Sequence, residues 1–191
     1  MHNHDPSTPL YLHHTIECQP RCWQSVARQL SANACLAPNL YGLWRSQIGT
    51  PRDHLNAITL CNGVDTQAIV DQLQSPSDVQ SVSATPMRAT LRPLTVEPPR
   101  RQGNFAFRWF ELAKGDYVEF ESLCAQAWPG FESAYDSQII GLWRCEQALG
   151  GDATRVLLLT RRPDLAMWER SKTPATEGEQ VVRDALSRRY D

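Results

Sequence analysis

Histidine, arginine and tyrosine side chains on two expected strands are the residues best suited to chemistry in this sequence. His13 lies in the segment LYLHHTIEC, and Arg108 lies in FAFRWFEL. A neutral imidazole accepts a proton near pH 7, and a guanidinium stabilises the resulting oxyanion. His13, Arg108 and Tyr11 are therefore candidates for acid–base catalysis on a small acidic or enolisable molecule. The alternative is that His13 only forms a hydrogen bond where two sheets meet.

Four further residues are candidates for contacts with a bound molecule: Thr15, Trp44, Trp143 and His54. Each tryptophan follows a glycine by two residues, so the two share a strand face and leave room beside the indole for a flat ligand. Core packing is the alternative for both tryptophans. His54 lies near the start of an expected strand, where it either reaches the mouth of a cavity or is solvated.

The sequence gives no pattern for a metal or a cofactor. Its six cysteines contain no C-x-x-C pair and no short spacing to histidine, so we expect them to be reduced. Glycine-rich phosphate loops and the G-x-S-x-G nucleophile motif are absent from the sequence. Haem is an alternative reading, and His13 is the axial ligand that it would use.

The first expected strand, Leu10–Cys18, must position the candidate residues. Apolar and polar positions alternate along it, which predicts that Leu12 and Ile16 face the helices. The residues expected on the opposite face are Tyr11, His13, Thr15 and Glu17. In the second half of the chain, the equivalent position is either Arg108 or Trp109, and the alignment leaves this choice open.

An internal similarity organises the chain. The tetrapeptide GLWR at Gly42–Arg45 recurs at Gly141–Arg144, and each copy follows a strand pattern and a helix pattern and precedes a second strand. Two copies of one βαββαβ unit are the simplest interpretation. We predict a first unit over residues 1–97, a linker over 98–104 and a second unit over 105–191.

The patterns also predict the individual elements. In the first unit they are a strand at 10–18, a helix from Pro20 to about Asn33, strands at 41–47 and 55–61, a helix capped by Asp65 and a strand at 87–92. In the second unit they are a strand at 105–112, a helix after Asp116, strands at 138–146 and 153–161, and helices after Pro163 and Thr176. No closing strand follows in the second unit.

This order predicts an α+β fold of two tandem ferredoxin-like units, each with its helices on one face of an antiparallel sheet. The other face of each sheet would be left bare. We therefore expect the units to pack sheet to sheet, as in a dimeric α/β-barrel, and to enclose a cavity for a small organic molecule.

Several segments resemble the NIPSNAP family of the dimeric α/β-barrel superfamily: GLWRSQIG, ATLRPL, FRWFELAKGD and IGLWRCE. The segment LHHTIECQP departs from the Arg-aromatic opening of that family. The resemblance implies the barrel fold and a superfamily that includes cofactor-free monooxygenases, isomerases, haem enzymes and proteins without known chemistry. We therefore expect a metal-free enzyme of the monooxygenase or isomerase type, with a non-catalytic binding or interaction protein as the alternative.

Composition narrows the classes of partner. The chain has 191 residues, of which 41% are hydrophobic and 21% charged, and its formal charge is −2. Charge this balanced, without a basic stripe, argues against nucleic acid as a partner. Neither a membrane-spanning run nor a signal-peptide pattern is present, so the sequence predicts a cytoplasmic protein without a membrane partner. A homodimer is left open.

Overall fold

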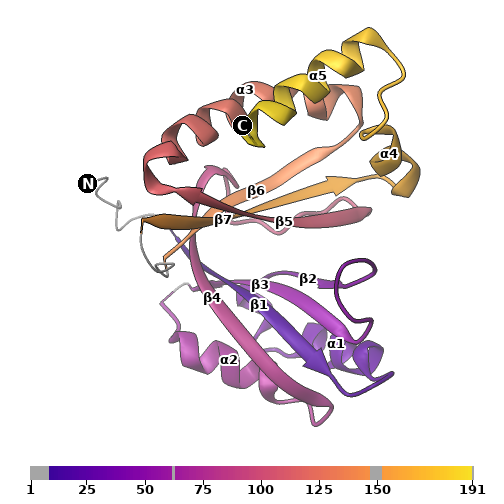
Figure 1. Ribbon diagram of the computed structural model, residues 1–191. Coiled ribbons are helices and arrows are strands. Elements are labelled where there is room, and N and C mark those ends of the chain that lie inside the picture. Colours follow the sequence, from indigo (N-terminus) through magenta and orange to yellow (C-terminus); the bar gives the residue numbers. More distant parts are fainter. Residues whose placement is uncertain (1–8, 62, 147–151, 191) are drawn as a thin grey trace. The chain divides into compact units, whose positions relative to one another are not determined.

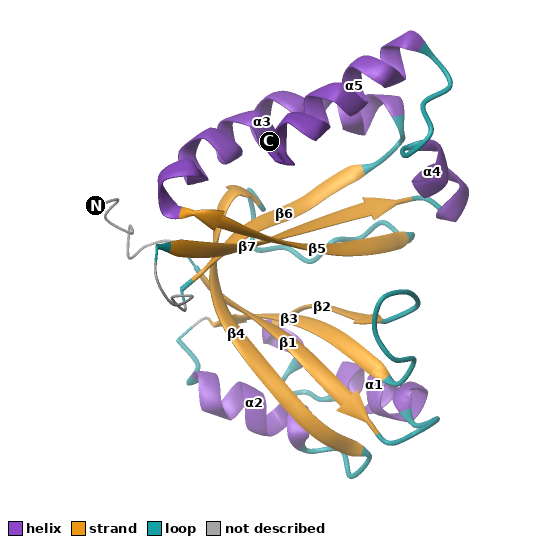
Figure 2. Ribbon diagram, viewed as in Figure 1, coloured by secondary structure: helices purple, strands orange, loops and turns teal. Residues whose placement is uncertain are grey.

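The computed structural model describes residues 9–61, 63–146 and 152–190. Two compact units make up the chain, one from the residues up to Ala89 together with Val96–Pro99, and the other from Thr90–Thr95 together with the residues from Arg100 onward. In each unit, helices cover one face of an antiparallel sheet (Figure 1, Figure 2). The predicted α+β class with ferredoxin-like units is confirmed.

The first unit has the βαββαβ order that the sequence predicts. Its elements are β1 (Leu10–Cys18), α1 (Trp23–Ala32), a 3-10 turn (Ala37–Asn39), β2 (Leu40–Arg45), β3 (His54–Cys61), α2 (Thr66–Gln74) and β4 (Val79–Arg92). The strands lie in the order β2-β3-β1-β4, and every pairing among them is antiparallel. This is the ferredoxin-like arrangement.

Strand β4 is longer than predicted. It begins at Val79 rather than at Met87 and pairs with β1 as far as Cys18. Pro86 is accommodated because β4 is the outermost strand of the first unit, where one row of backbone groups has no neighbour to bond within that unit. The end of β4 belongs to the second unit, where Thr90 Oγ1 donates to the carbonyl of Leu142 (3.1 Å).

The second unit contains the predicted strands and helices. Its elements are β5 (Asn104–Ala113), a 3-10 turn (Lys114–Asp116), α3 (Tyr117–Ala134), β6 (Gln138–Cys145), β7 (Ala153–Arg162), α4 (Leu165–Arg170), α5 (Glu177–Ser187) and a 3-10 turn (Arg188–Tyr190). Strands β4, β6, β7 and β5 follow one another across its sheet. In the described part of the chain no strand pairs with the outer edge of β5, as the absence of a closing strand in the sequence predicts.

Two of the three predicted helix caps form. The carboxylate of Asp65 accepts from the backbone N–H of Gln67, and the hydroxyl of Thr176 accepts from the backbone N–H of Glu179. Asp116 makes no capping bond, because a 3-10 turn precedes α3 and leaves this residue in a helical conformation. The predicted capping box at Asp116 is therefore wrong.

Helix α3 continues past the point where its apolar pattern ends. Pro129 lies inside the helix and removes one backbone hydrogen bond. Trp128 and Phe131, on either side of it, are both buried in the core of the second unit. Their packing holds the helix together as far as Ala134.

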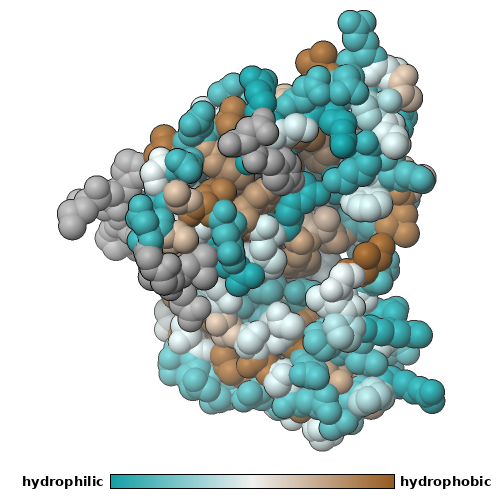
Figure 3. Space-filling view, in the orientation of Figure 1, coloured by the Kyte–Doolittle hydropathy of each residue, from teal (hydrophilic) through white to brown (hydrophobic). Residues whose placement is uncertain are grey.

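Each sheet buries one face under its own helices. The core of the first unit includes Leu12, Ile16, Val26, Leu30, Leu55, Ala57, Ile69 and Leu73. The core of the second includes Phe110, Phe120, Cys124, Trp128, Phe131, Ile139, Leu142, Val156 and Leu158. On the outer surface of α3 and α5, hydrophobic side chains form small patches separated by hydrophilic ones (Figure 3).

Candidate functional site

Strand β1 divides its side chains between two environments. Leu12 and Ile16 pack in the core under the helices of the first unit, as predicted. Because side chains alternate along a strand, Tyr11 and His13 lie on the opposite face, which we call the helix-free face. His14 lies on the helix-covered face, where its Nε2 is 2.9 Å from Thr59 Oγ1.

His13 is held by a hydrogen bond from the neighbouring strand. Its side chain is 5% exposed, and its Nε2 donates to Asn56 Oδ1 on β3 (3.0 Å). A neutral imidazole carries one N–H, so this bond places the proton on Nε2 and the basic lone pair on Nδ1. The arrangement gives His13 a defined tautomer, which a proton acceptor requires.

Tyr11 lies two residues before His13 on β1, so the two side chains are neighbours on the same face. It is 1% exposed, and its ring meets that of Tyr41 edge to face, with 5.6 Å between centroids. Burial raises the pKa of Tyr11 to about 12. Burial also raises the pKa of Tyr41, with a further contribution from Tyr11. Both phenols therefore stay protonated at neutral pH, and Tyr11 is suited to donate a hydrogen bond rather than to act as a base.

Thr15 and His54 share the helix-free face with His13. Thr15 lies opposite Asn56 in the β1–β3 pairing, and Glu17 lies opposite His54. His54 Nε2 is 4.0 Å from the carboxylate of Glu17, at the end of the sheet, and both side chains are partly exposed. The structure thus brings four of the predicted site residues onto one face: Tyr11, His13, Thr15 and His54. The pair of Glu17 and His54 lies at one end of this face, and Tyr11 lies toward the other.

Arg108 lies on the helix-covered face of the second sheet. Its neighbour Phe110, two positions along β5, packs against Phe120 in the core with 4.9 Å between ring centroids. The helix-free position belongs to Trp109, over whose ring Arg155 lies at 4.3 Å. Of the two alternatives for this face, the structure selects Trp109, and the expectation that Arg108 faces the same space as His13 is wrong.

The two predicted tryptophans lie over their own glycines. A Cβ atom added at Gly42 would overlap the ring of Trp44, and one added at Gly141 would overlap the ring of Trp143. The space beside each glycine is therefore filled by the indole of its own strand. Trp143 is fully buried and Trp44 half-buried, which agrees with the core-packing alternative.

The described residues contain no group of three or more histidine, cysteine or acidic side chains placed to hold a metal ion. All six cysteines are free thiols. The Nε2 atom of His13 is bonded to Asn56, so this histidine does not fit an axial haem ligand that binds through Nε2. Among the described helices, none is both long and apolar enough to span a membrane.

Asn56, the hydrogen-bond partner of His13, is not among the residues that the sequence predicts for the site. It lies within the apolar run LNAITLC, where asparagine is unfavourable for a strand. A polar residue of low strand propensity at a position facing His13 was the available signal.

Comparisons with known proteins identify the fold. No family model matches the chain, and no curated protein matches it in sequence. An anthrone oxidase-like protein of solved structure matches with a TM-score of 0.60 and 12% identity, over 97% of this chain and 86% of that one. A protein from Lactobacillus acidophilus NCFM, provisionally described as a monooxygenase, matches with a TM-score of 0.54 and 8% identity, over 94% and 88%.

A third solved structure, provisionally described as a chlorite dismutase, matches with a TM-score of 0.52 and 15% identity. It covers 95% of this chain and 88% of the other. Identities this low establish the fold alone, which is that of the dimeric α/β-barrel proteins.

Proposed function

We propose that this chain binds a small organic molecule on the helix-free face of its first unit and acts on it by acid–base chemistry, with His13 as the proton acceptor. The observation that carries the proposal is the partly buried hydrogen bond from His13 Nε2 to Asn56 Oδ1 (3.0 Å). It orients the imidazole and fixes which nitrogen takes the proton. Tyr11, protonated at neutral pH, is the proposed donor to the oxygen on which negative charge develops.

Thr15 and His54 are the proposed substrate contacts, because both lie on the same face as His13. Trp44, which lies opposite Asn56 in the β2–β3 pairing, is proposed to line the site through the ring face that does not cover Gly42. Trp143 lies in the second unit and has no part in this proposal. Arg108 has no part in this proposal. The fold supports it in a general way, because the similar structures include a protein described as anthrone oxidase-like and one described as a monooxygenase.

Membership of the NIPSNAP family is the finer part of this proposal. The segments GLWRSQIG and IGLWRCE support it. A homodimer is likewise a prediction, and the molar mass from light scattering in solution tests it.

A non-catalytic binding protein is the second candidate, and one observation favours it. Three residues of the helix-free face are almost completely buried: Tyr11 on β1, Ile58 on β3 and Met87 on β4. A face packed this closely serves as well for stability as for binding.

Hydrogen exchange at carbon separates the two candidates. We would incubate the protein in D2O with anthrone or another small enolisable aromatic ketone and follow loss of the acidic C–H signal by NMR. Wild type is expected to exchange faster than buffer, and His13→Gln to lose about 100-fold or more of that rate. His14→Gln is the matched control, because His14 is adjacent but lies on the other face.

Asn56→Leu tests the positioning role, because it keeps the imidazole but removes its hydrogen-bond partner. We expect a lower exchange rate with little change in ketone affinity. Exchange at the buffer rate in wild type, with the fold intact by circular dichroism, would favour the non-catalytic candidate. An equal loss in His13→Gln and His14→Gln would contradict the role of His13.

A further inference from the structure

A pocket lies inside the second unit, between its sheet and its helices, and it has no part in the function proposed above. Its volume is about 100 Å³, and its walls come from β5, β6, β7, α3, α5 and the segment after α4. A single water needs roughly 10–15 Å³ of such space. The pocket therefore has room for a molecule of several non-hydrogen atoms.

Positive charge converges on this pocket. Five basic side chains line it: Arg108, Arg162, Lys172, Arg183 and Arg189. None of the described lining residues is Asp or Glu. Burial lowers the pKa of Lys172 to about 8, and the four arginines lower it further in the same direction. The cations crowd one another here, and a bound anion would relieve that repulsion.

Two buried N–H donors of the lining have no acceptor among the described residues. They are Nε of Arg162, whose residue is 4% exposed, and Nε1 of Trp128, whose residue is 3% exposed. Arg162 Nη1 donates to Thr160 Oγ1 (3.2 Å), so the guanidinium is fixed in place while Nε is left unbonded. A buried donor without an acceptor costs stability, and a ligand oxygen removes that cost.

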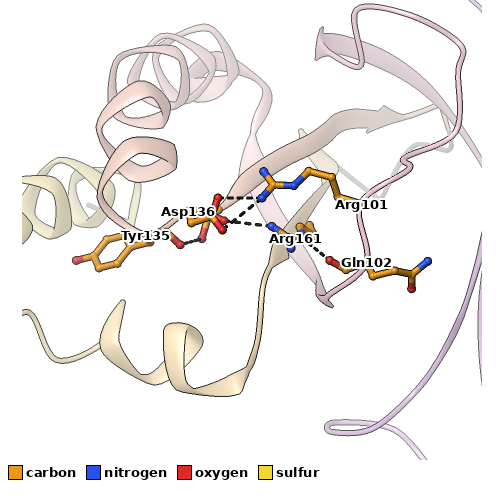
Figure 4. Close-up of polar contacts among 6 residues, drawn as sticks. Arg101, Gln102, Tyr135, Asp136 and Arg161 are labelled. Carbon is orange, nitrogen blue, oxygen red and sulfur yellow. Dashed lines mark hydrogen bonds and ion pairs between the residues drawn. The ribbon is translucent and has the colours of Figure 1, made fainter.

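The adjacent residue, Arg161, is a buried arginine whose Nε does have an acceptor. Arg161 lies on the opposite face of β7, where its Nε donates to the carbonyl of Gln102 (2.7 Å) and its Nη1 to the carbonyl of Asp136 (3.2 Å) (Figure 4). Asp136 also pairs with Arg101. The two arginines are similarly buried, but the hydrogen bond of Arg162 goes to a threonine hydroxyl, and its guanidinium lies over the ring of Phe131 at 5.1 Å.

The remaining wall of the pocket is apolar. It consists of Trp128, Phe131, Ile139, Leu158 and Leu186, beside the hydroxyl groups of Thr160, Ser171 and Ser187. Apolar walls with a few convergent polar groups are typical of sites for organic ligands. Inorganic phosphate would leave this apolar surface without a partner.

We propose that this pocket binds a small organic carboxylate, with its oxygens at Arg162 and Lys172 and its carbon skeleton against Phe131 and Leu158. An arginine side chain is well matched to a carboxylate, because two parallel N–H groups of the guanidinium have the spacing of the two oxygens. The site lies wholly in the second unit, whereas His13 lies in the first. The two proposals are therefore tested independently.

Calorimetric titration of the full chain with benzoate tests the proposal. Inorganic phosphate and neutral benzamide are the comparison ligands. Benzoate is expected to bind more tightly than either, and more weakly at high salt, because charge–charge attraction is screened. Lys172→Gln and Arg162→Gln are each expected to weaken benzoate binding by about tenfold or more, the effect of losing one charged hydrogen bond.

Arg161→Gln is the matched control, and it should leave benzoate binding within about threefold of wild type. If Arg162→Gln fails to fold, Lys172→Gln still tests the proposal, because Lys172 is more exposed than Arg162 and less important for packing. Absence of benzoate binding, or equal binding by wild type and Lys172→Gln, would overturn the proposal. Tighter binding of phosphate would overturn the organic ligand, and equal binding of benzamide would overturn the role of charge.

Discussion

Between the sheet and the helices, the two units have side chains of different charge at corresponding positions. Gly42 pairs with Ile58 in the first unit, and Gly141 pairs with Leu159 in the second. Counting along the paired strands from these positions matches His14 with Arg108, Thr59 with Thr160 and Cys61 with Arg162. Two of these three places thus hold uncharged side chains in the first unit and arginine in the second, and the third holds threonine in both.

The consequences of that difference follow from burial. In the first unit, the uncharged His14 bonds to Thr59 and fits inside an apolar core. In the second unit, the guanidinium groups of Arg108 and Arg162 line a pocket between the sheet and the helices. Replacing neutral residues with cations at fixed positions turns part of a core into a candidate anion site.

On the helix-free faces, the first unit has the polar side chain and the second unit has an apolar one. The same register matches His13 with Phe107, because these residues pair with Ile58 and Leu159 respectively. The polar pair of His13 and Asn56 therefore has no counterpart in the second unit. Each unit carries its own candidate chemistry on a different face.

The largest expected effect concerns the two glycines under the tryptophans. Gly141→Ala places a methyl group inside the ring of Trp143, which is fully buried, so we expect a loss of about 3 kcal/mol in the free energy of unfolding. Gly42→Ala should cost about 1 kcal/mol, because half-buried Trp44 can turn toward solvent. Urea unfolding measures both. A larger loss for Gly42→Ala would show that the first unit packs its indole more rigidly.

The next effect is a pH dependence that belongs to the first unit. Burial lowers the pKa of His14 to about 4, with a smaller contribution from His13. Between pH 6.5 and 4 the unfolded chain binds a proton that the folded chain does not, so stability falls as pH falls through this range. The difference amounts to about 3 kcal/mol at pH 4.

Urea unfolding at pH 7 and pH 4.5 measures this dependence in wild type and in His14→Gln. The variant loses the contribution of His14 but keeps those of the carboxylates, so its stability should fall less between the two values. Parallel pH profiles of the two proteins would be incompatible with a neutral, buried His14.

A smaller effect separates two arginine–carboxylate pairs of the second unit. Arg92 forms a bidentate pair with Glu132 (2.6 and 3.1 Å), and both side chains are less than one-third exposed. Arg92→Gln is expected to cost about 2 kcal/mol, the value of a hydrogen bond to a charged group. Arg101→Gln breaks the exposed pair with Asp136 (Figure 4) and should cost less than about 0.5 kcal/mol.

Thermal unfolding of the two arginine variants checks this order. The first pair ties the end of β4 to α3, whereas the second joins two exposed side chains. If Arg101→Gln proves the more costly variant, the loop before β5 contributes more to stability than its exposure indicates.

Much of the fold could be predicted because its signals are local. The alternation of Leu12 and Ile16 fixed the faces of β1, and apolar spacing located every helix that the structure describes. The extent of β4 could not be predicted, because Ser81, Ser83 and Pro86 have low strand propensity and are held by pairing with β1. Tertiary pairing overrode local preference there.

The site was less predictable, because an error of one residue in aligning a strand assigns its side chains to the wrong face of the sheet. A shift of one position moves a strand residue to the other face, and the choice between Arg108 and Trp109 was such a shift. The two units differ in loop length, so the spacing of the GLWR copies does not transfer to β5. The pocket around Arg162 joins segments distant in sequence, and no local pattern indicates it.

The smallest expected effects come from the helix caps, one of which the sequence misassigned. Asp65→Ala in the first unit and Thr176→Ala in the second each remove a side-chain acceptor from a helix N-terminus and should cost about 1 kcal/mol. Asp116→Ala removes no such bond and should change stability by only a few tenths of a kcal/mol, roughly the value of a charge near a helix end. Urea midpoints measured at one pH compare the three variants. A cost for Asp116→Ala equal to the others would mean that its carboxylate caps α3 in solution, in which case the 3-10 turn before that helix would have to open.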